Sequence, residues 1–387
     1  MKNRIKSAKQ ARLVLEDGSE YSGYCFGKAR SQAGEVVFYT GMGGYPQTLT
    51  DPGFRGQILV STYPLVGNGG VPVKARTGEP ISDEQGIPLY FESLSVQIAG
   101  LVVSEACEEP SHFSSGSTLS AWLDKNNVPG IYGIDTRALT LRLRENGAMQ
   151  GKIIVEGSRD LTMDSGIIPN PVAEVSQPEV RIYRSPAPKK KTEGSAPVRI
   201  APVRIAVIDC GVKAGVLRCL LSRNVEIIRL PWNHSLEKLD YDGLFLSSGP
   251  GDPKACGKTI AMVRRAFDQK KPIFGTGLGC EIMALAAGGD TYKLPWGHRG
   301  QNQPCLETGT SRCYITSQNH GYAIRAENLP KSWVPWFTNA NDNTVEGIRS
   351  TRLPFQAVQF NPEGCPGPRD TEFLIERFIE QVRESKK

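Results

Sequence analysis

The segment from residue 271 to residue 287, KPIFGTGLGCEIMALAA, restricts the fold more than any other part of the chain. The apolar residues 272–274 are typical of a short buried strand. Residues 282–287 are apolar and helix-forming. A glycine-rich turn separates the two. A strand that turns into a helix through G-x-x-x-G is typical of a nucleophile elbow, which presents a strained residue at a helix N-terminus. The presented residue here is Gly277, which has no side chain.

Strand and helix patterns alternate in the sequence that precedes this elbow. Strands are predicted at 205–208, 226–230 and 243–246, and helices near 213–222 and 258–269. Alternation with short connections predicts a parallel sheet flanked by helices, and the functional loops of such a fold lie at the carboxyl ends of the strands. We therefore expect Ser248–Gly251, Gly277 and Asn319–Gly321 at such ends or in adjoining loops.

The N-terminal half has a different pattern, with more strands than helices. Strands are predicted on both sides of an Asp17-Gly18 turn and at 34–39, 58–64 and 99–105, with helices at 118–126 and 136–146. Asp135 is the predicted N-cap of the last helix, and Gly147 follows its end. This half is predicted to be a mixed β/α domain.

A segment rich in Pro, Lys, Ser and Ala, residues 184–203, separates the two halves. Such a composition is typical of a linker between domains. A chain of 387 residues is also long for one hydrophobic core. We predict an N-terminal domain at 1–183, a linker at 184–203 and an α/β domain at 204–387.

Charge and cysteine usage exclude several classes of function. The 46 basic and 40 acidic residues give a net charge of only +6, and the only basic run is Lys189–Lys191, so nucleic-acid binding is not expected. No apolar stretch is long enough to cross a membrane, and the N-terminus has no apolar leader, so a cytoplasmic protein is expected. The nine cysteines form no C-x-x-C pair and are predicted to be reduced.

Several short strings give the chain a resemblance to a known family. They are GEVVF at 34–38, GYPQTLTDP at 44–52, LSSGPGDP at 246–253, TSQNHGYA at 316–323 and AVQFNPE at 357–363. With the elbow, they make nearly the whole chain similar to the small, glutaminase subunit of carbamoyl phosphate synthetase. The resemblance implies a small-subunit N-terminal domain followed by a class I glutamine amidotransferase domain with a central, mostly parallel sheet.

The resemblance also implies a partner and a pathway. The partner is the large synthetase subunit, which uses bicarbonate, ATP with Mg²⁺, and ammonia that normally arrives from glutamine through an internal tunnel. No cofactor and no metal site are expected in this chain. The product, carbamoyl phosphate, serves arginine and pyrimidine synthesis.

The residues that carry out glutamine hydrolysis in this family are largely absent. Class I glutaminases use a cysteine nucleophile, a histidine base and a glutamate that orients the base. By family position the cysteine is replaced by Gly277 and the histidine by Asn361, and only Glu363 is retained. Losing a nucleophile and base that act as a unit costs on the order of a million-fold in turnover.

The expected glutamine pocket has changed in parallel. Gly53 stands where the family has a serine, and Cys280 and Glu281 stand where it has histidine and glutamine. A carboxylate at 281 is expected to repel the α-carboxylate of the substrate. The glutamine-contacting positions, by resemblance, are Gly53, Gly249, Gly251, Leu278, Glu281, Asn319, Gly321 and Tyr322.

These substitutions predict a catalytically silent glutaminase domain whose synthetase partner uses free ammonia and which binds glutamine weakly at most. One alternative is an active glutaminase with a rewired nucleophile, for which Cys280 and His320 are the candidates. Another is a free-standing binding or regulatory protein. A deliberately inactivated variant also fits the sequence.

Overall fold

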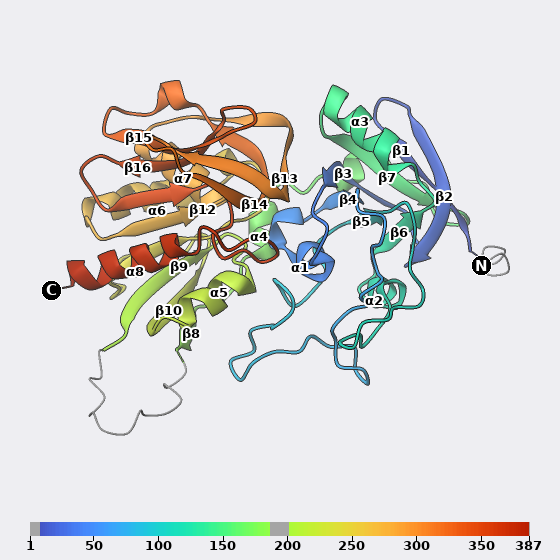
Figure 1. Cartoon of the computed structure of the whole chain (residues 1–387), viewed down its shortest axis with the longest axis horizontal. Helices are drawn as coiled ribbons and strands as arrows, with labels where there is room; N and C mark the ends of the chain where they lie inside the picture. The colour runs from blue at the N-terminus through green and yellow to red at the C-terminus, as the bar shows by residue number, and fades with distance from the viewer. Residues whose placement is uncertain (1–7, 186–200, 387) are drawn as a thin grey trace.

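The computed structural model describes residues 8–185 and 201–386, which form two domains placed side by side (Figure 1). The N-terminal domain runs from blue to green in the figure and the C-terminal domain from yellow-green to red. Most of the predicted linker, residues 186–200, lies outside the described residues.

The N-terminal domain is built on a closed barrel in the order β1-β2-β6-β5-β4-β3-β7. The strands are β1 (Gln10–Leu15), β2 (Glu20–Gly27), β3 (Gln32–Tyr39), β4 (Gln57–Ser61), β5 (Gly100–Val102), β6 (Pro129–Tyr132) and β7 (Met149–Val155). Side chains alternate between the two faces of a strand, so one strand can supply two cores. In β3, Val36 and Phe38 enter one buried cluster, whereas Val37 and Tyr39 enter another.

The two longer helices of this domain lie where the sequence predicts them, at 118–126 and 136–146, and its shorter helical segments are not predicted from the sequence. The helical segments are α1 (Tyr45–Thr50), η2 (Pro52–Phe54), α2 (Leu119–Lys125), α3 (Thr136–Asn146), η3 (Met163–Gly166) and α4 (Pro171–Val175). The side chain of Asp135 accepts a hydrogen bond from the Ala138 N–H, which confirms the predicted N-cap of α3. Gly147 follows α3 with φ of +90°, a conformation that favours glycine.

The C-terminal domain contains a ten-stranded sheet in the order β14-β13-β15-β16-β17-β12-β11-β9-β10-β8. Its strands are β8 (Arg181–Arg184), β9 (Val203–Asp209), β10 (Val225–Pro231), β11 (Gly243–Leu246), β12 (Ile273–Thr276), β13 (Thr291–Glu307), β14 (Cys313–Ile324), β15 (Trp333–Asn339), β16 (Val345–Ser350) and β17 (Phe355–Val358). The central strands, from β17 to β10, are parallel, as predicted. The flanking strands are antiparallel.

Two pairs of helices cover the two faces of this sheet. The helices are α5 (Ala214–Leu221), α6 (Gly257–Asp268), α7 (Leu278–Ala287) and α8 (Phe373–Ser385), with short turns η4 (Pro253–Ala255) and η5 (Ala326–Asn328). Along β9, Ala206 and Ile208 pack in the core that contains α6 and α7, and Ile205 and Val207 pack in the core that contains α5 and α8. A central strand buried on both faces explains the continuous apolar run of β9.

The C-terminal sheet begins earlier in the sequence than the predicted boundary at residue 183. Strand β8 (Arg181–Arg184) pairs antiparallel with β10, and Val172 of α4 packs in the core beneath α6 and α7. The N–H of Gln177 also donates to the Asp209 carboxylate. Residues from about 172 onward therefore already contact the C-terminal domain.

One local prediction is wrong. Asn319, His320 and Gly321 do not lie in a loop but inside β14, where Asn319 faces Arg299 and His320 faces His298 of β13. The sequence Asn-His-Gly is typical of a turn, but the long β13–β14 hairpin supplies enough cross-strand hydrogen bonds to hold it extended.

Candidate functional site

The predicted elbow is confirmed as a strand, a turn and a helix. Strand β12 ends at Thr276 and α7 begins at Leu278, with Gly277 between them at φ +51° and ψ −120°. The Gly277 N–H donates to the Val358 carbonyl at 2.9 Å, and its own carbonyl accepts from Cys280 and Glu281 in the first turn of α7. Glycine occupies this positive-φ conformation without the strain that a side chain would cause.

The two other positions of the expected triad follow β17. Asn361 is buried, and its N–H donates to the Ser317 carbonyl at 2.9 Å. Glu363 is also buried, and its Oε1 accepts from Lys213 Nζ at 2.7 Å. Within the described residues no group donates to the other oxygen of Glu363. Glu363 is therefore the partner of a buried lysine, and no histidine is there for it to orient.

The helix end that follows Lys213 is bound to Glu92 of the N-terminal domain. Lys213 precedes α5, and Glu92 receives hydrogen bonds at that helix end from the N–H groups of Ala214 and Gly215. Arg218 donates to the other carboxylate oxygen of Glu92 at 3.1 Å. Burial raises the pKa of Glu92 to about 7, although Lys213 and Arg218 act in the opposite direction. The ion pairs of Glu363 with Lys213 and of Glu92 with Arg218 therefore form a largely buried charged cluster between the domains.

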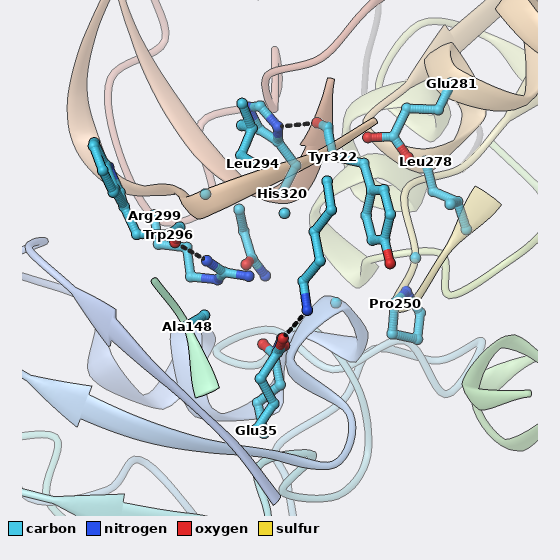
Figure 2. A pocket seen from close by; sticks show the side chains of 18 residues that line it. Glu35, Ala148, Pro250, Leu278, Glu281, Leu294, Trp296, Arg299, His320 and Tyr322 are labelled. Atoms are coloured by element: carbon cyan, nitrogen blue, oxygen red, sulfur yellow. Dashed lines mark hydrogen bonds and ion pairs between the residues drawn. The ribbon is translucent and has the colours of Figure 1, made fainter. Parts of the chain in front are cut away.

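A cavity of about 100 Å³ lies beside the elbow, between the two domains. All of the predicted glutamine-contacting residues line it. Figure 2 shows Leu278, Glu281 and Tyr322 of the C-terminal domain at one end and Glu35 and Ala148 of the N-terminal domain at the other. The members predicted from the sequence are Gly53, Gly249, Gly251, Leu278, Glu281, Asn319, Gly321 and Tyr322.

Glu281 differs from the expectation of a repelling negative charge. Its side chain is buried and accepts a hydrogen bond from the Gln359 amide, which also donates to the Tyr322 carbonyl. Burial raises the pKa of Glu281 to about 8. Burial therefore favours the protonated form of this carboxyl group near neutral pH, in contrast to the carboxylate expected from the sequence.

Gly53 packs closely against Asn319 of the C-terminal domain. Asp51 accepts from the Gly53 N–H at 2.8 Å and from Asn319 Nδ2 at 3.1 Å. A Cβ atom on residue 53 would lie 2.7 Å from Asn319 Nδ2. A serine at this position would therefore require the Asn319 amide to move.

The cavity also contains charged residues that the sequence reasoning missed. Lys293 forms an ion pair with Glu35 at 2.7 Å, which joins the two domains across the cavity. Arg299 is 6% exposed, and its Nη1 donates to the Trp296 carbonyl (Figure 2). Their positions depend on the register of β13, for which the sequence gives no periodic signal.

The structure gives no support to a thiolate nucleophile at Cys280. Its thiol is fully buried in the core beneath α7, and burial raises the thiol pKa well above its ordinary value. His320 lies within hydrogen-bond distance of the Tyr322 carbonyl at 2.7 Å and of Gln318 Oε1 at 3.1 Å. The two ring nitrogens are thus directed at other groups, and burial lowers the pKa of the imidazole well below its ordinary value.

A second histidine and a carboxylate lie next to His320. His298 and Glu346 are buried, and His298 Nδ1 lies 3.0 Å from Glu346 Oε1. The sequence reasoning predicted no metal ligand, and the separation of these residues along the chain gives no ligand motif. Only the pairing of β13 with β14 brings the two histidines opposite each other.

No helix within residues 8–185 and 201–386 combines the length and apolar character needed to cross a membrane.

Comparison with known proteins agrees with this architecture. Residues 13–153 match the carbamoyl-phosphate synthase small chain, CPSase domain, and residues 206–381 match glutamine amidotransferase class-I. The multifunctional protein URA2 of Saccharomyces cerevisiae is 45% identical over 391 residues, covering 97% of this chain, and the multifunctional protein pyr1-3 of Dictyostelium discoideum is 44% identical over 389 residues, covering 98%.

A third relative is the human mitochondrial carbamoyl-phosphate synthase [ammonia], which is 42% identical over 381 residues and covers 98% of this chain. The chain spans 18%, 17% and 24% of the lengths of these three relatives. The first match covers the barrel and the second covers most of the ten-stranded sheet, in the same order along the chain. The chain therefore belongs to the carbamoyl-phosphate synthase small-chain family, and its second domain is a class I glutamine amidotransferase domain.

Proposed function

We propose that this chain is a non-hydrolysing glutaminase region that supports carbamoyl phosphate synthesis from free ammonia. Its partner is a large synthetase chain or region, which binds bicarbonate and ATP. The observation that carries the proposal is Gly277 at the elbow, in the place where the family holds its cysteine thiol. Without that thiol no glutamyl thioester can form.

The surroundings of the elbow support the same conclusion. Asn361 occupies the position of the base, and an amide cannot accept a proton at neutral pH as an imidazole does. Glu363 is held by Lys213 at 2.7 Å. Cys280, the nearest thiol along the chain, is fully buried. Neither a nucleophile nor a base is available for an ordinary class I mechanism.

The names of the relatives support the choice of nitrogen donor and partner. One of them, from Homo sapiens, is a carbamoyl-phosphate synthase [ammonia], and relatives of that name also come from Aquarana catesbeiana and Mus musculus. Each of these is about four times as long as this chain, because the chain covers 24% of its length. The remaining length provides room for the synthetase region that we propose as partner.

The test is carbamoyl phosphate synthesis by the chain assembled with its synthetase partner, with glutamine or ammonium as the nitrogen donor. We expect activity with ammonium and none above background with glutamine. A Gly277→Cys/Asn361→His variant serves as the matched control, because it restores the two reacting groups in the same cavity. Glutamine-dependent synthesis by the unmodified chain, at a rate comparable with ammonium, would refute the proposal.

The retained cavity favours a second candidate, a regulatory chain that binds a small amino acid without hydrolysing it. The eight expected contact residues still surround about 100 Å³ of space. Titration calorimetry with glutamine and glutamate distinguishes this candidate, since it requires binding by the chain alone. Absence of any effect of the bound amino acid on the synthetase would exclude a regulatory role.

A further inference from the structure

We propose that His298, His320 and Glu346 form a binding site for a transition-metal dication of the Zn²⁺ class. The proposal is independent of the proposed function. The residues come from three strands: His298 lies on β13, His320 lies opposite it on β14, and Glu346 lies on β16, next to the pairing of Ile324 with Val345. All three side chains are buried.

The potential ligand atoms are close to one another. One nitrogen from each histidine and one oxygen from Glu346 lie within 4.8 Å of one another. His298 Nδ1 lies 3.0 Å from Glu346 Oε1, and His320 Nε2 lies 3.7 Å from Glu346 Oε2. Zinc bonds of about 2.0–2.2 Å place tetrahedral ligands roughly 3.3 Å apart. The two nitrogen–oxygen separations lie on either side of that value but end on different oxygens of Glu346, and the three ligand atoms span up to 4.8 Å, so binding an ion requires side-chain rotations that bring them closer.

The ring nitrogens that face away from the proposed ion, Nδ1 of His320 and Nε2 of His298, have hydrogen-bond partners that orient both imidazoles. His320 Nδ1 lies 2.7 Å from the Tyr322 carbonyl (Figure 2), and its Nε2 lies 3.1 Å from Gln318 Oε1. Both oxygens can only accept, so a neutral imidazole donates to one of them; in the tautomer that binds a metal, Nδ1 donates to the carbonyl and Nε2 presents its lone pair to the ion. His298 Nε2 lies 2.9 Å from Asp342 Oδ2 and its Nδ1 lies 3.0 Å from Glu346 Oε1, so in the tautomer that binds a metal Nε2 donates to Asp342 and Nδ1 presents its lone pair to the ion. Metal-binding histidines commonly have this second contact to a carbonyl or carboxylate.

The second observation is a buried acceptor that lacks a donor. Within the described part of the chain, Glu346 Oε2 accepts no hydrogen bond, although it lies 3.7 Å from His320 Nε2. In the metal-binding tautomer this oxygen and the His320 Nε2 lone pair face each other in a buried place, and a cation between them would satisfy both. A proton on His298 would satisfy Glu346 Oε1, which also accepts from Asn339 at 3.1 Å, but would leave Oε2 unsatisfied. A metal ion would bind both Glu346 Oε2 and His320 Nε2.

The donor set selects the class of metal. Two imidazoles and one carboxylate suit Zn²⁺, Co²⁺, Ni²⁺ or Cu²⁺, whereas Ca²⁺ and Mg²⁺ prefer sets made of oxygen alone. Three protein ligands leave a fourth position for water or another donor. The Gln318 amide, 3.1 Å from His320 Nε2, is the group that a metal would displace. Because His320 also lines the cavity, the ion would lie at its wall.

The test uses the full chain, stripped with a chelator and titrated with ZnCl₂ by calorimetry, with bound metal counted by mass spectrometry. We expect one ion per chain and a higher thermal midpoint with Zn²⁺, because a ligand of the native state stabilises it. His298→Ala and Glu346→Gln should weaken binding at least a hundredfold. Asp342→Asn, which alters only the orientation of His298, should weaken it by about 10- to 100-fold.

The matched control is His112→Ala, since His112 is exposed on the other domain and should leave the affinity unchanged. Co²⁺ provides a spectroscopic readout, because a four-coordinate protein site absorbs strongly in the visible range and the hydrated ion does not. Circular dichroism of each variant confirms folding. The proposal is overturned if the stripped chain binds no Zn²⁺, or if His298→Ala and Glu346→Gln, when folded, bind it as tightly as the His112→Ala control.

Discussion

The elbow corner and the cavity beside it differ in how many of the residues expected from the family they contain. At the corner, Gly277 and Asn361 lack reactive groups, and Glu363 is paired with Lys213. In the cavity, all eight expected contact residues still face one space. The corner depends on two or three side chains, whereas the cavity depends on the backbone of β11, α7 and β14 and on the meeting of two domains. The side chains at the corner can therefore change without altering the scaffold that forms the cavity.

The largest change in stability is expected from replacing Lys213 at the corner. In Lys213→Met, the buried Glu363 carboxylate loses its cation, whereas Glu92 keeps Arg218, and we expect the free energy of unfolding to fall by about 3–5 kcal/mol. Urea unfolding at pH 7 measures the change. Lys254→Met is the matched control, because the exposed Lys254–Asp290 pair has the same 2.7 Å separation and should contribute less than about 1 kcal/mol.

Adding Glu363→Gln to Lys213→Met should recover part of the lost stability, because it removes the uncompensated charge. Equal losses for Lys213→Met and Lys254→Met would mean that the corner is not the structural centre inferred here.

The next effect concerns Glu281 at the wall of the cavity. Because the pKa of Glu281 is raised to about 8, the native state holds a proton that the unfolded state releases near pH 4.5, so stability falls as pH rises between these values. Glu281→Gln should remove this part of the pH dependence, a gain on the order of 2–4 kcal/mol above pH 8. Unfolding curves at pH 5, 7 and 9 measure it.

Glu237→Gln is the control for Glu281, since Glu237 is exposed and pairs with Arg265 at the surface. It should leave the pH dependence unchanged. Part of the slope between pH 5 and pH 7 should persist in Glu281→Gln, because the pKa of Glu92 is also raised, to about 7. Parallel curves for Glu281→Gln and the unmodified chain would contradict a protonated Glu281.

A smaller effect is expected at the elbow itself. Gly277→Ala places a side chain at φ +51° and puts its Cβ 3.0 Å from Ser248 Cβ, so we expect a loss of about 1–2 kcal/mol. Thermal unfolding measures the change. Gly257→Ala is the control, since a Cβ there meets no atom within 4 Å and lies in α6, where alanine should stabilise slightly.

If Gly277→Ala is as stable as Gly257→Ala, the elbow carries no strain, and a glycine there offers no structural advantage.

The smallest effect concerns the contact at the cavity wall between Gly53 of the N-terminal domain and Asn319 of the C-terminal domain. Gly53→Ser restores the family serine but displaces the Asn319 amide from Asp51, at a cost of about 0.5–1 kcal/mol. The cost should shrink in an Asn319→Ala background, because the displaced amide is then absent. A double-mutant cycle by urea unfolding measures the coupling, and a coupling of zero would place residues 53 and 319 out of contact.

Much of the fold was predictable from local patterns. Apolar strands alternating with helices predicted the parallel centre of the sheet, and Asp135 and the glycine turn at 277 marked the ends of helices correctly. The antiparallel flank was not predicted, because β13 runs for 17 residues with irregular register and shows no clear alternation. The turn-like string Asn319–Gly321 predicts a loop, although these residues lie inside β14.

The site was predictable only in part. The resemblance identified the residues around the cavity, but the ion cluster joins Glu92, Lys213 and Glu363, which are more than a hundred residues apart along the chain. The histidine pair depends on the cross-strand register of His298 with His320. Such contacts are set by tertiary packing and have no counterpart in local sequence.

The early start of the C-terminal sheet has a consequence for how the chain can be divided. Strand β8 belongs covalently to the N-terminal half but lies at the edge of the C-terminal sheet, beside β10. Two polypeptides, one ending at Ser185 and the other beginning at Ala201, would each carry part of one sheet. Produced together, they should assemble as a split protein by strand complementation, with Glu92 and the end of α5 as a second point of attachment.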